Sequence, residues 1–116
     1  MNGEQLRLEE TMQQIENVMN QKPEPIENMQ SVYQFDITGA EEGTYQLHLQ
    51  AGKAKVIQGI ESDPVCTLKM SSKNFHKFLT GNLGGTVAFM TGKLKIDGDI
   101  TKAMKLETLL KQYNLE

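Results

Sequence analysis

Three side chains in this 116-residue sequence could carry out chemistry: those of two histidines and one cysteine. His48 and His76 could bind a metal ion or transfer a proton if the fold brought them together. However, His48 falls on the polar side of a predicted strand, and His76 neighbours Lys77 on a predicted short helix, so both are expected on the solvated surface. Cys66 falls on the apolar side of its strand, which predicts a buried, unreactive thiol rather than a nucleophile.

The remaining motifs do not complete a catalytic or cofactor site. Asp97-Gly98-Asp99 begins like a calcium loop, but the alternating oxygen ligands and the terminal glutamate are missing. A strand-to-helix turn with an N-cap is the better interpretation of these three residues. The Ala-Gly-Lys and Thr-Gly-Lys triplets lack the upstream glycine of a phosphate-binding loop, and no Gly-x-Ser-x-Gly occurs. We therefore expect no catalytic residue, no metal and no cofactor.

Composition disfavours several classes of protein. A net charge of −3 argues against nucleic acid as a partner, and Lys93 and Lys95 alternate with apolar residues instead of gathering beside aromatic ones. No apolar run approaches the ~18 residues of a membrane-spanning helix, and the polar N-terminus does not resemble a signal peptide. The single cysteine fits a reducing compartment. These features predict a cytoplasmic protein of one domain, residues 1–116, with at most transient membrane contact, either a monomer or a homodimer.

The first element that could position such residues is a helix over residues 4–20, within an N-terminal segment 1–22. Two prolines, Pro23 and Pro25, prevent the helix from continuing. Its apolar residues recur every three or four positions and so share one side, which we expect to be buried: Leu8, Met12, Ile15 and Met19.

Strands follow, because apolar and polar residues then alternate. Three such runs, 32–38, 44–50 and 54–59, are separated by short turns and should form an antiparallel meander. Two further runs, 65–70 and 93–98, supply a fourth and a fifth strand. The outward residues of the first two strands are polar, which predicts a sheet with one solvent-facing side: Gln34, Asp36, Thr38, Gln46, His48 and Gln50.

Helices complete the expected fold. Ser71 or Ser72 can cap a short helix after the fourth strand, and Asp99 can cap a last helix over residues 100–113. That last helix carries too wide an apolar arc to face only one neighbouring surface. The predicted order is α-β-β-β-β-α-α-β-α, an α+β fold with a five-stranded, mostly antiparallel sheet covered on one face by helices.

The segment between the last two strands combines large apolar residues with glycine. Phe78-Leu79-Thr80-Gly81 recurs as Phe89-Met90-Thr91-Gly92, and Gly84 and Gly85 lie between the two copies. Such short, glycine-flanked helices are weak on their own, because helix nucleation is costly and glycine loses much backbone freedom on ordering. We interpret them as a lid over an adaptable apolar pocket, with Gly81, Gly84, Gly85 and Gly92 as its hinges.

Three stretches of the chain carry a family resemblance: GTYQLHLQAGKAKV, VCTLKMSSKNFHKFLTG and FMTGKLKIDGDITKAMKL. They resemble the sterol carrier protein 2 family over residues 32–116. The resemblance implies helices and a sheet that enclose an apolar tunnel for long-chain fatty acids, acyl-CoA, sterols or isoprenoid lipids. Carried over by position, the cavity wall would consist of Phe35, Leu47, Leu68, Phe75, Phe78, Leu79, Val87, Phe89, Met90, Met104, Leu109 and Leu110.

The resemblance leaves three functions open. The first is a non-catalytic intracellular carrier of apolar lipids. The second is an accessory protein that presents isoprenoid intermediates to biosynthetic enzymes, and the third is a structural or dimerisation domain without a ligand. The sequence ends in Tyr-Asn-Leu-Glu rather than in a peroxisomal Ser-Lys-Leu signal and carries no fused catalytic domain, so we expect a stand-alone prokaryotic member.

Overall fold

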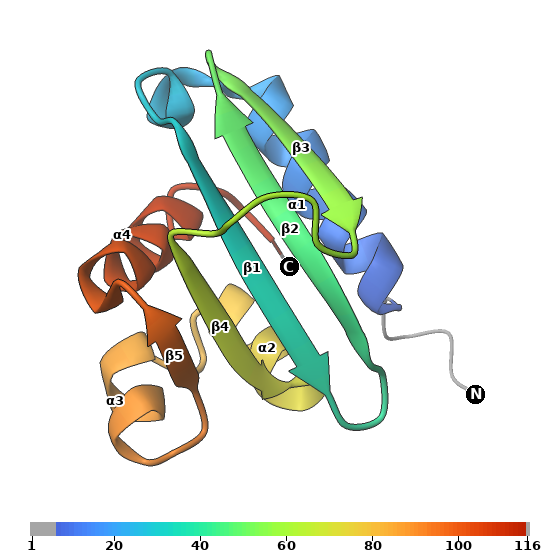
Figure 1. Cartoon of the computed structure of the whole chain (residues 1–116), viewed down its shortest axis with the longest axis vertical. Coiled ribbons are helices and arrows are strands. Elements are labelled where there is room, and N and C mark those ends of the chain that lie inside the picture. The colour runs from blue at the N-terminus through green and yellow to red at the C-terminus, as the bar shows by residue number, and fades with distance from the viewer. Residues whose placement is uncertain (1–6, 116) are drawn as a thin grey trace.

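A computed structural model describes residues 7–115, and a single mixed sheet organises them (Figure 1). The strands are β1 (Ser31–Thr38), β2 (Gly43–Gln50), β3 (Lys53–Gln58), β4 (Cys66–Ser71) and β5 (Lys95–Gly98), in the spatial order β3-β2-β1-β4-β5. The first three form the expected antiparallel meander. β4 lies parallel to β1 and antiparallel to β5, so the sheet is mostly antiparallel, as predicted.

Helix α1 (Leu8–Gln21) packs along the edge of the sheet through its predicted apolar side. Met12, Ile15 and Met19 are fully buried. Its polar side chains bond to β3, since Glu16 Oε1 accepts from the Val56 amide at 2.7 Å and Asn20 bonds both backbone groups of Ala54. These bonds satisfy backbone groups that an edge strand would otherwise expose. The first residues of the predicted helix, 4–6, lie outside the described residues.

The other helices begin where the sequence predicts caps. Helix α2 (Ser72–Leu79) starts after Ser71, whose hydroxyl accepts from the Asn74 amide, and α4 (Ile100–Leu110) starts after Asp99, whose carboxylate accepts from the Lys102 amide. Helix α3 (Gly85–Met90) has six residues, and a short 3₁₀ helix, η1 (Glu24–Ile26), follows α1. The order of helices and strands is the predicted one, with η1 added.

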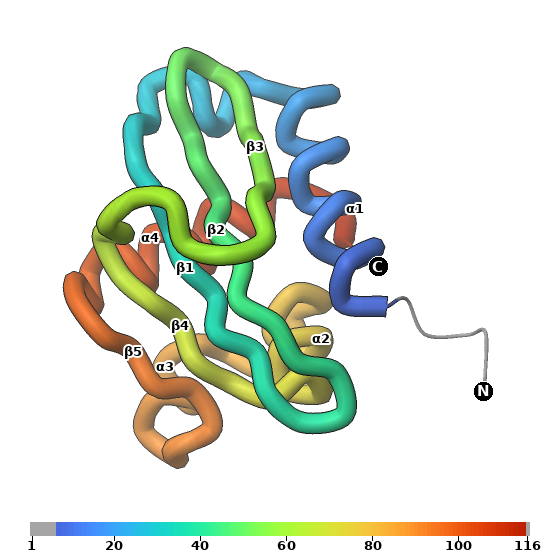
Figure 2. Tube along the Cα trace, turned by 45° about the vertical axis from the view of Figure 1, so that its right-hand side comes forward, coloured from blue at the N-terminus to red at the C-terminus, as the bar shows by residue number. Residues whose placement is uncertain are grey.

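Three helices form a layer on one face of the sheet, as Figures 1 and 2 show from two directions. Helix α1 lies behind β2 and β3, α2 lies behind β1 and β4, and α4 packs against β4 and β5. The core fills the space between this layer and the sheet. Helix α3 is different, because it sits beside β5 at the end of the molecule and contacts α4.

The opposite face of the sheet is less exposed than its polar residues predict. Gln46 is fully buried and Gln34 nearly so, because the segment between β3 and β4 crosses over them (Figure 1). The Gln46 side chain donates to the carbonyl of Ser62 at 2.8 Å and accepts from the amides of Glu61 and Ser62. It also donates to Gln34 Oε1 at 2.9 Å. The expectation of a fully solvated face was therefore wrong at its centre, where polar side chains bind a covering loop.

The last helix is shorter than predicted. Its α-helical hydrogen bonding ends at Leu110, and a turn redirects the chain from α4 toward α1 (Figure 2). The Tyr113 hydroxyl donates to the carbonyl of Lys22 at 2.8 Å, just beyond α1. Leu115 is buried in the core. The segment after α4 thus closes the layer between two helices that are far apart in the sequence.

Candidate functional site

Most of the predicted wall residues meet in one apolar core. Eight of them are buried and belong to a single cluster between the sheet and the helical layer: Phe35, Leu47, Leu68, Phe75, Phe78, Leu79, Leu109 and Leu110. Phe35 and Phe75 bring β1 and α2 together, with ring centroids 5.4 Å apart. Their role as the wall of a ligand cavity stays a prediction.

The other four predicted wall residues lie elsewhere. Val87, Phe89 and Met90 on α3 are exposed to 60%, 39% and 79%, and Met104 on α4 is partly buried. Helix α3 buries only Gly85 and Ala88. In the structure, therefore, its large apolar side chains point to solvent rather than into the core.

The repeated Phe-Xaa-Thr-Gly segments form two copies of one helix end. In α2 the Gly81 amide donates to the Phe78 carbonyl at 3.3 Å, and the Asn82 amide donates to the Lys77 carbonyl at 2.8 Å. Helix α3 repeats both bonds with the same lengths, through the amides of Gly92 and Lys93 to Phe89 and Ala88. This is the Schellman arrangement, which requires a left-handed residue; φ is +82° at Gly81 and +80° at Gly92.

The two central glycines have another environment. Gly84 has φ −70°, which any residue can adopt, and a Cβ placed there would meet nothing within 4 Å. Gly85 lies against Glu107 of α4, because its amide donates to Glu107 Oε2 at 2.7 Å and an added Cβ would approach Oε1 to 2.6 Å. This contact ties the start of α3 to α4. Whether the four glycines act as hinges stays a prediction.

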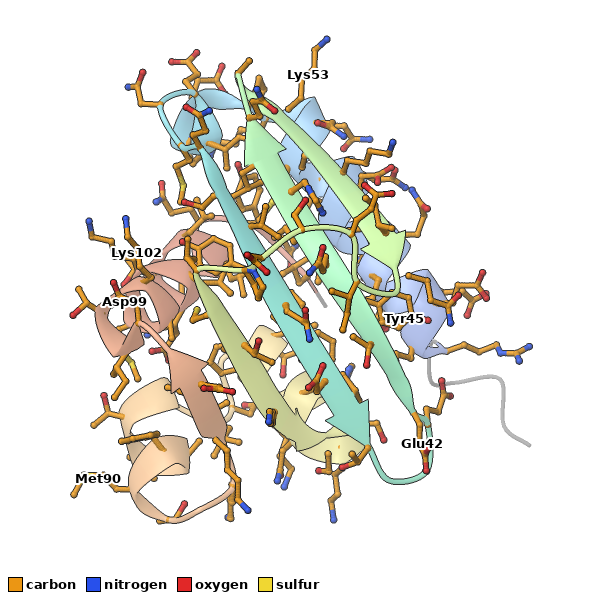
Figure 3. The ribbon with its side chains drawn as sticks, viewed as in Figure 1. Glu42, Tyr45, Lys53, Met90, Asp99 and Lys102 are labelled. Carbon is orange, nitrogen blue, oxygen red and sulfur yellow. The ribbon has the colours of Figure 1, made fainter. Side chains whose placement is uncertain are left out.

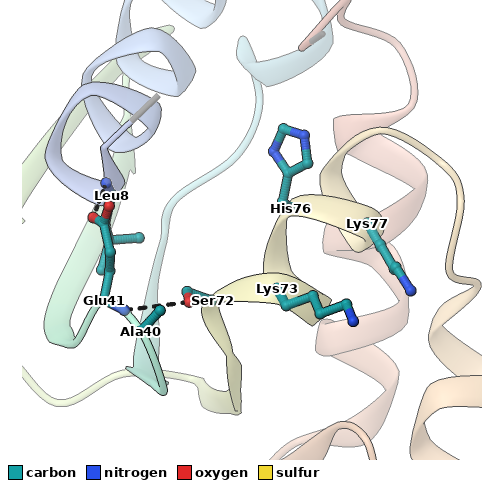
Figure 4. A pocket seen from close by; sticks show the side chains of 7 residues that line it. All are labelled: Leu8, Ala40, Glu41, Ser72, Lys73, His76 and Lys77. Carbon is teal, nitrogen blue, oxygen red and sulfur yellow. Dashed lines mark hydrogen bonds between the residues drawn. The ribbon is translucent and has the colours of Figure 1, made fainter. Parts of the chain in front are cut away.

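A pocket of about 470 Å³ opens into the helical layer between α1 and α2 (Figure 4). Its volume is within the range of small-molecule sites. Leu8, Ala40 and Glu41 form one side, and residues from the first two turns of α2 form the other, with a mainly apolar surface. The α2 residues are Ser72, Lys73, His76 and Lys77.

Glu41 connects the two sides of this pocket. Its carboxylate accepts from the Leu8 amide at the start of α1 at 2.6 Å, and its own amide donates to the Ser72 hydroxyl at 3.4 Å (Figure 4). The turn between β1 and β2 therefore holds the beginnings of α1 and α2 at a fixed separation. Sequence reasoning missed this contact, because residues 8, 41 and 72 come together only through the sheet topology.

Packing within the helical layer is uneven. Helices α1, α2 and α4 each contact the strands more extensively than they contact one another. Met12 and Met19 on α1 and Met70 on β4 are buried, and methionine side chains are unbranched and adapt readily to a change in cavity shape. The boundary between α1 and α2, where the pocket lies, is therefore among the less extensively packed parts of this layer.

Two other hollows suit an apolar guest less well. One, of about 1140 Å³, follows α1 and the outer surface of β3 and is lined largely by polar side chains. The other, of about 560 Å³, lies between η1 and α4 and includes Tyr33 and Lys105. Both are more open and more polar than the pocket between α1 and α2. Of the three, the pocket between α1 and α2 has the most apolar surface, and its lining residue Leu8 also belongs to the core.

The residues considered for catalysis lie apart from one another. His48 bonds to Gln46 Oε1 at 3.1 Å on the outer face of the sheet, whereas His76 lines the pocket on the helical side. Cys66 is buried, as predicted, and burial followed by the nearby charge of Asp99 raises the pKa of its thiol to about 11. Within residues 7–115, no three of the His, Cys, Asp and Glu side chains are placed to hold a metal ion.

The family of the chain follows from comparison with known proteins. Residues 12–111 match the model of the SCP-2 sterol transfer family. The chain belongs to this family. The match covers the sheet, α2, α3, α4 and all of α1 except its first four residues, so Leu8 is the one pocket-lining residue outside it.

Relatives that are similar to this chain include larger proteins. The chain is 42% identical to hydroxysteroid dehydrogenase-like protein 2 of Xenopus tropicalis over 92% of its own length. The mouse protein of the same name is 39% identical over the same share. The chain spans only 25% and 22% of these two proteins, so the SCP-2 family match concerns one part of each.

Solved structures share the fold. The sterol carrier protein domain 2 of Helicoverpa armigera superposes with a TM-score of 0.77 and 29% identity, covering 97% of this chain and 91% of that one. Palmitated SCP2L2 from Aedes aegypti gives a TM-score of 0.69 and 22% identity, covering 90% and 95%. The second likeness shows the fold alone. In residues 7–115, no helix is both long enough and apolar enough to cross a membrane.

Proposed function

We propose that this chain is a non-catalytic lipid carrier that holds an acyl chain between its helical layer and its sheet. The observation that carries the proposal is the apolar pocket between α1 and α2, whose lining residue Leu8 also belongs to the apolar core. Family membership gives independent support. The acyl chain of a fatty acid or acyl-CoA would pass between Leu8 and α2, and the eight buried wall residues would line its path.

Burial of the acyl chain supplies enough free energy for this role. About ten methylenes at ~0.8 kcal/mol each contribute about 8 kcal/mol, which is on the order of a micromolar dissociation constant before the costs of association. Sterols and isoprenoid lipids present similar apolar area. Specificity for the apolar part should therefore be broad.

The rim of the pocket favours an anionic head group. Lys73 and Lys77 lie on exposed positions of α2 beside His76, and among residues 7–115 Glu41 is the only acidic residue lining the pocket. Its carboxylate is already bonded to the amide of Leu8. A carboxylate or phosphate at the mouth would meet two lysines, which favours fatty acids or acyl-CoA over neutral lipids.

A second candidate function is that of a lipid-binding module within a larger protein. The relatives named above match this chain over only about a quarter of their length. In such a protein the domain could deliver a lipid, including an isoprenoid intermediate, to a neighbouring catalytic domain. The free carrier and the module would use the same pocket, so lipid binding does not distinguish them. It does distinguish both from a structural domain that binds no ligand.

Binding rather than catalysis is favoured by the distribution of reactive groups. The Cys66 thiol is buried with a raised pKa, and the two histidines lie on opposite sides of the sheet. A cytoplasmic location is part of the proposal, since a lone unpaired thiol is compatible with a reducing compartment.

The direct test is palmitate uptake, followed by native mass spectrometry and by displacement of a fluorescent fatty acid. We expect a one-to-one adduct. Ala40→Trp should fill the mouth of the pocket and lower affinity at least tenfold, whereas Glu42→Trp, on the same turn but outside the pocket, should bind normally. Absence of an adduct with the unmodified chain would reject the carrier and favour the scaffold. Equal affinity in both variants would place the ligand elsewhere.

A further inference from the structure

Helix α3 exposes an unusual group of large apolar side chains. Among residues 7–115 five large hydrophobic residues are exposed, and four of them lie at one end of the molecule. Three are on α3 (Val87, Phe89 and Met90), and Ile100 begins α4 with 45% exposure. Figure 3 shows Met90 directed away from the ribbon, on the side of the molecule where α4 begins near Asp99. We call these four residues the α3 surface.

The α3 surface is presented by a fixed element. The amide of Gly85 bonds to Glu107 of α4, Ala88 is fully buried, and the Schellman bonds close the helix at Gly92. A six-residue helix held at both ends cannot easily turn its large side chains inward. The exposed apolar group is therefore a stable property of the surface rather than the result of a loose segment.

Charge is distributed very unequally along the chain. Residues 7–63 contain ten acidic and four basic residues, whereas residues 64–115 contain eight lysines and three acidic residues. The net charge is therefore −6 for residues 7–63, the acidic half, and +5 for residues 64–115, the basic half. The basic half contains β4, α2, α3, β5 and α4, which includes the entire α3 surface.

Lysines flank the α3 surface directly in the sequence. Lys93 and Lys95 follow α3, and Lys102 and Lys105 lie on the first two turns of α4. Within the described range the only ion pair joins Lys111 to Glu107, so none of these four lysines is neutralised by a salt bridge. Asp97 and Asp99 are also exposed in this stretch, so residues 93–105 contain four lysines and two acidic residues. Apolar side chains beside an excess of unpaired lysines match the interface of an anionic bilayer, where acyl chains lie beneath acidic head groups.

We propose that the α3 surface docks the protein onto a bilayer containing anionic lipid. Val87, Phe89 and Met90 enter the boundary between head groups and acyl chains, and the flanking lysines contact the head groups. Attraction of the basic half orients the molecule with the acidic half, α1 and β3 included, away from the membrane. A second copy of the chain fits this surface less well, because a symmetric contact would bring two basic halves together.

The test is flotation of the 116-residue chain with vesicles of phosphatidylcholine, with or without phosphatidylserine. We expect binding only with phosphatidylserine and its loss near 1 M salt, where the screening length is about 3 Å. Met90→Gln should weaken binding roughly tenfold, from the lost apolar insertion. Lys93→Gln with Lys95→Gln should weaken it about 25-fold, at roughly fivefold per lysine near the surface.

Matched variants in the acidic half provide the controls. Ile60 is 69% exposed but lies between β3 and β4, and Lys53 and Lys55 are exposed on β3. Ile60→Gln and the double change Lys53→Gln with Lys55→Gln should float as the unmodified chain does. Equal losses in the two sets would overturn the proposal, and so would absence of binding to phosphatidylserine vesicles. Self-association that Met90→Gln abolishes, without vesicle binding, would assign the surface to a second copy instead.

This inference goes beyond the proposed carrier function, and the two can fail separately. Vesicle binding measures the α3 surface, whereas palmitate uptake in solution measures the pocket between α1 and α2. Ala40→Trp should float normally while losing palmitate, and Met90→Gln should bind palmitate normally while losing vesicles. Loss of both properties in either variant would contradict the separation of the two sites.

Discussion

Helices α2 and α3 end in the same way but have opposite environments. Both close with a Phe-Xaa-Thr-Gly-Xaa-Leu sequence, the same two Schellman bonds and a glycine with φ near +80°. Helix α2 buries Phe75, Phe78 and Leu79 against the sheet. Helix α3 buries only its two small residues and exposes Phe89 at the position equivalent to Phe78.

The comparison shows that a repeated motif fixes the local structure of the helix end but not the environment of its phenylalanine. The helix end is a local property, because its hydrogen bonds involve residues within six positions of one another. The environment of the phenylalanine is a tertiary property, since it depends on whether the helix lies behind the sheet or beside β5. The same motif can therefore close a core-forming helix and present a surface-forming one.

The largest expected effect tests this contrast at the two phenylalanines. Phe78→Ala should lower the free energy of unfolding by about 3–5 kcal/mol, because a buried aromatic ring leaves a cavity. Phe89→Ala should cost about 1 kcal/mol or less, because its side chain is already 39% exposed. Urea unfolding midpoints of both variants measure the difference. Similar losses would show that α3 packs as part of the core.

The strand leading into α2 offers a pH-dependent test of the buried side. Burial raises the pKa of Cys66 from 9.0 to about 11. The folded state therefore retains a proton that the unfolded state loses, so stability is present below pH 9 and falls as the pH rises through about 11. The contribution is up to roughly 2–3 kcal/mol.

Urea unfolding of the unmodified chain and of Cys66→Ala, across this pH range, isolates the contribution of the thiol. Burial also raises the pKa of Tyr33, Tyr45 and Tyr113, so part of the alkaline loss should persist in the variant. The slope of stability against pH should be shallower in Cys66→Ala. Identical slopes, or rapid alkylation of the native protein at neutral pH, would mean that the thiol is accessible.

A smaller effect sharpens what the two helices share. Gly81→Ala and Gly92→Ala should each lower the free energy of unfolding by about 1–2 kcal/mol, because alanine must adopt the left-handed conformation there. The added methyl group itself meets no atom within 4 Å at either position, so the backbone conformation alone causes the loss. Gly84→Ala should change stability by less than about 0.5 kcal/mol. At Gly84, alanine is a poorer N-cap than glycine, but it also reduces the conformational entropy of the unfolded chain, and the two effects on stability offset each other. Urea midpoints test all three, and a large loss at Gly84 with none at Gly81 would reverse the assignment of the constrained positions.

Local patterns predict much of this fold. The apolar stripe of α1, the alternation in the strands and the caps at Ser71 and Asp99 depend on neighbouring residues, and the sequence alone indicates them. The burial of Gln46 could not be predicted in this way, because its partners lie 15 and 16 positions away in a crossing loop. The helix-ending role of Gly81 and Gly92 is also a local signal, because their bonds join residues close in the sequence, whereas their role as hinges stays a prediction.

The candidate site was predictable only in part. Residues of the core could be named from their periodicity, which reports the side of an element that faces inward. The pocket mouth could not, because Leu8, Glu41 and Ser72 meet through the packing of α1 and α2 onto the sheet. The exposure of Val87, Phe89 and Met90 could not be predicted from the sequence either, because such hydrophobic residues are also typical of a core helix.

Methionine methyl groups provide the most direct test of where the acyl chain lies. The chain should be labelled at its methionine methyls and titrated, without vesicles, with a stearate that carries a spin label near its methyl end. We expect broadening of the buried Met12 and Met70 signals, because both lie in the helix–sheet layer, and a sharp Met90 signal, because α3 is outside it. Broadening of Met90 while Met12 and Met70 stay sharp would contradict the account and move the lipid to the α3 surface.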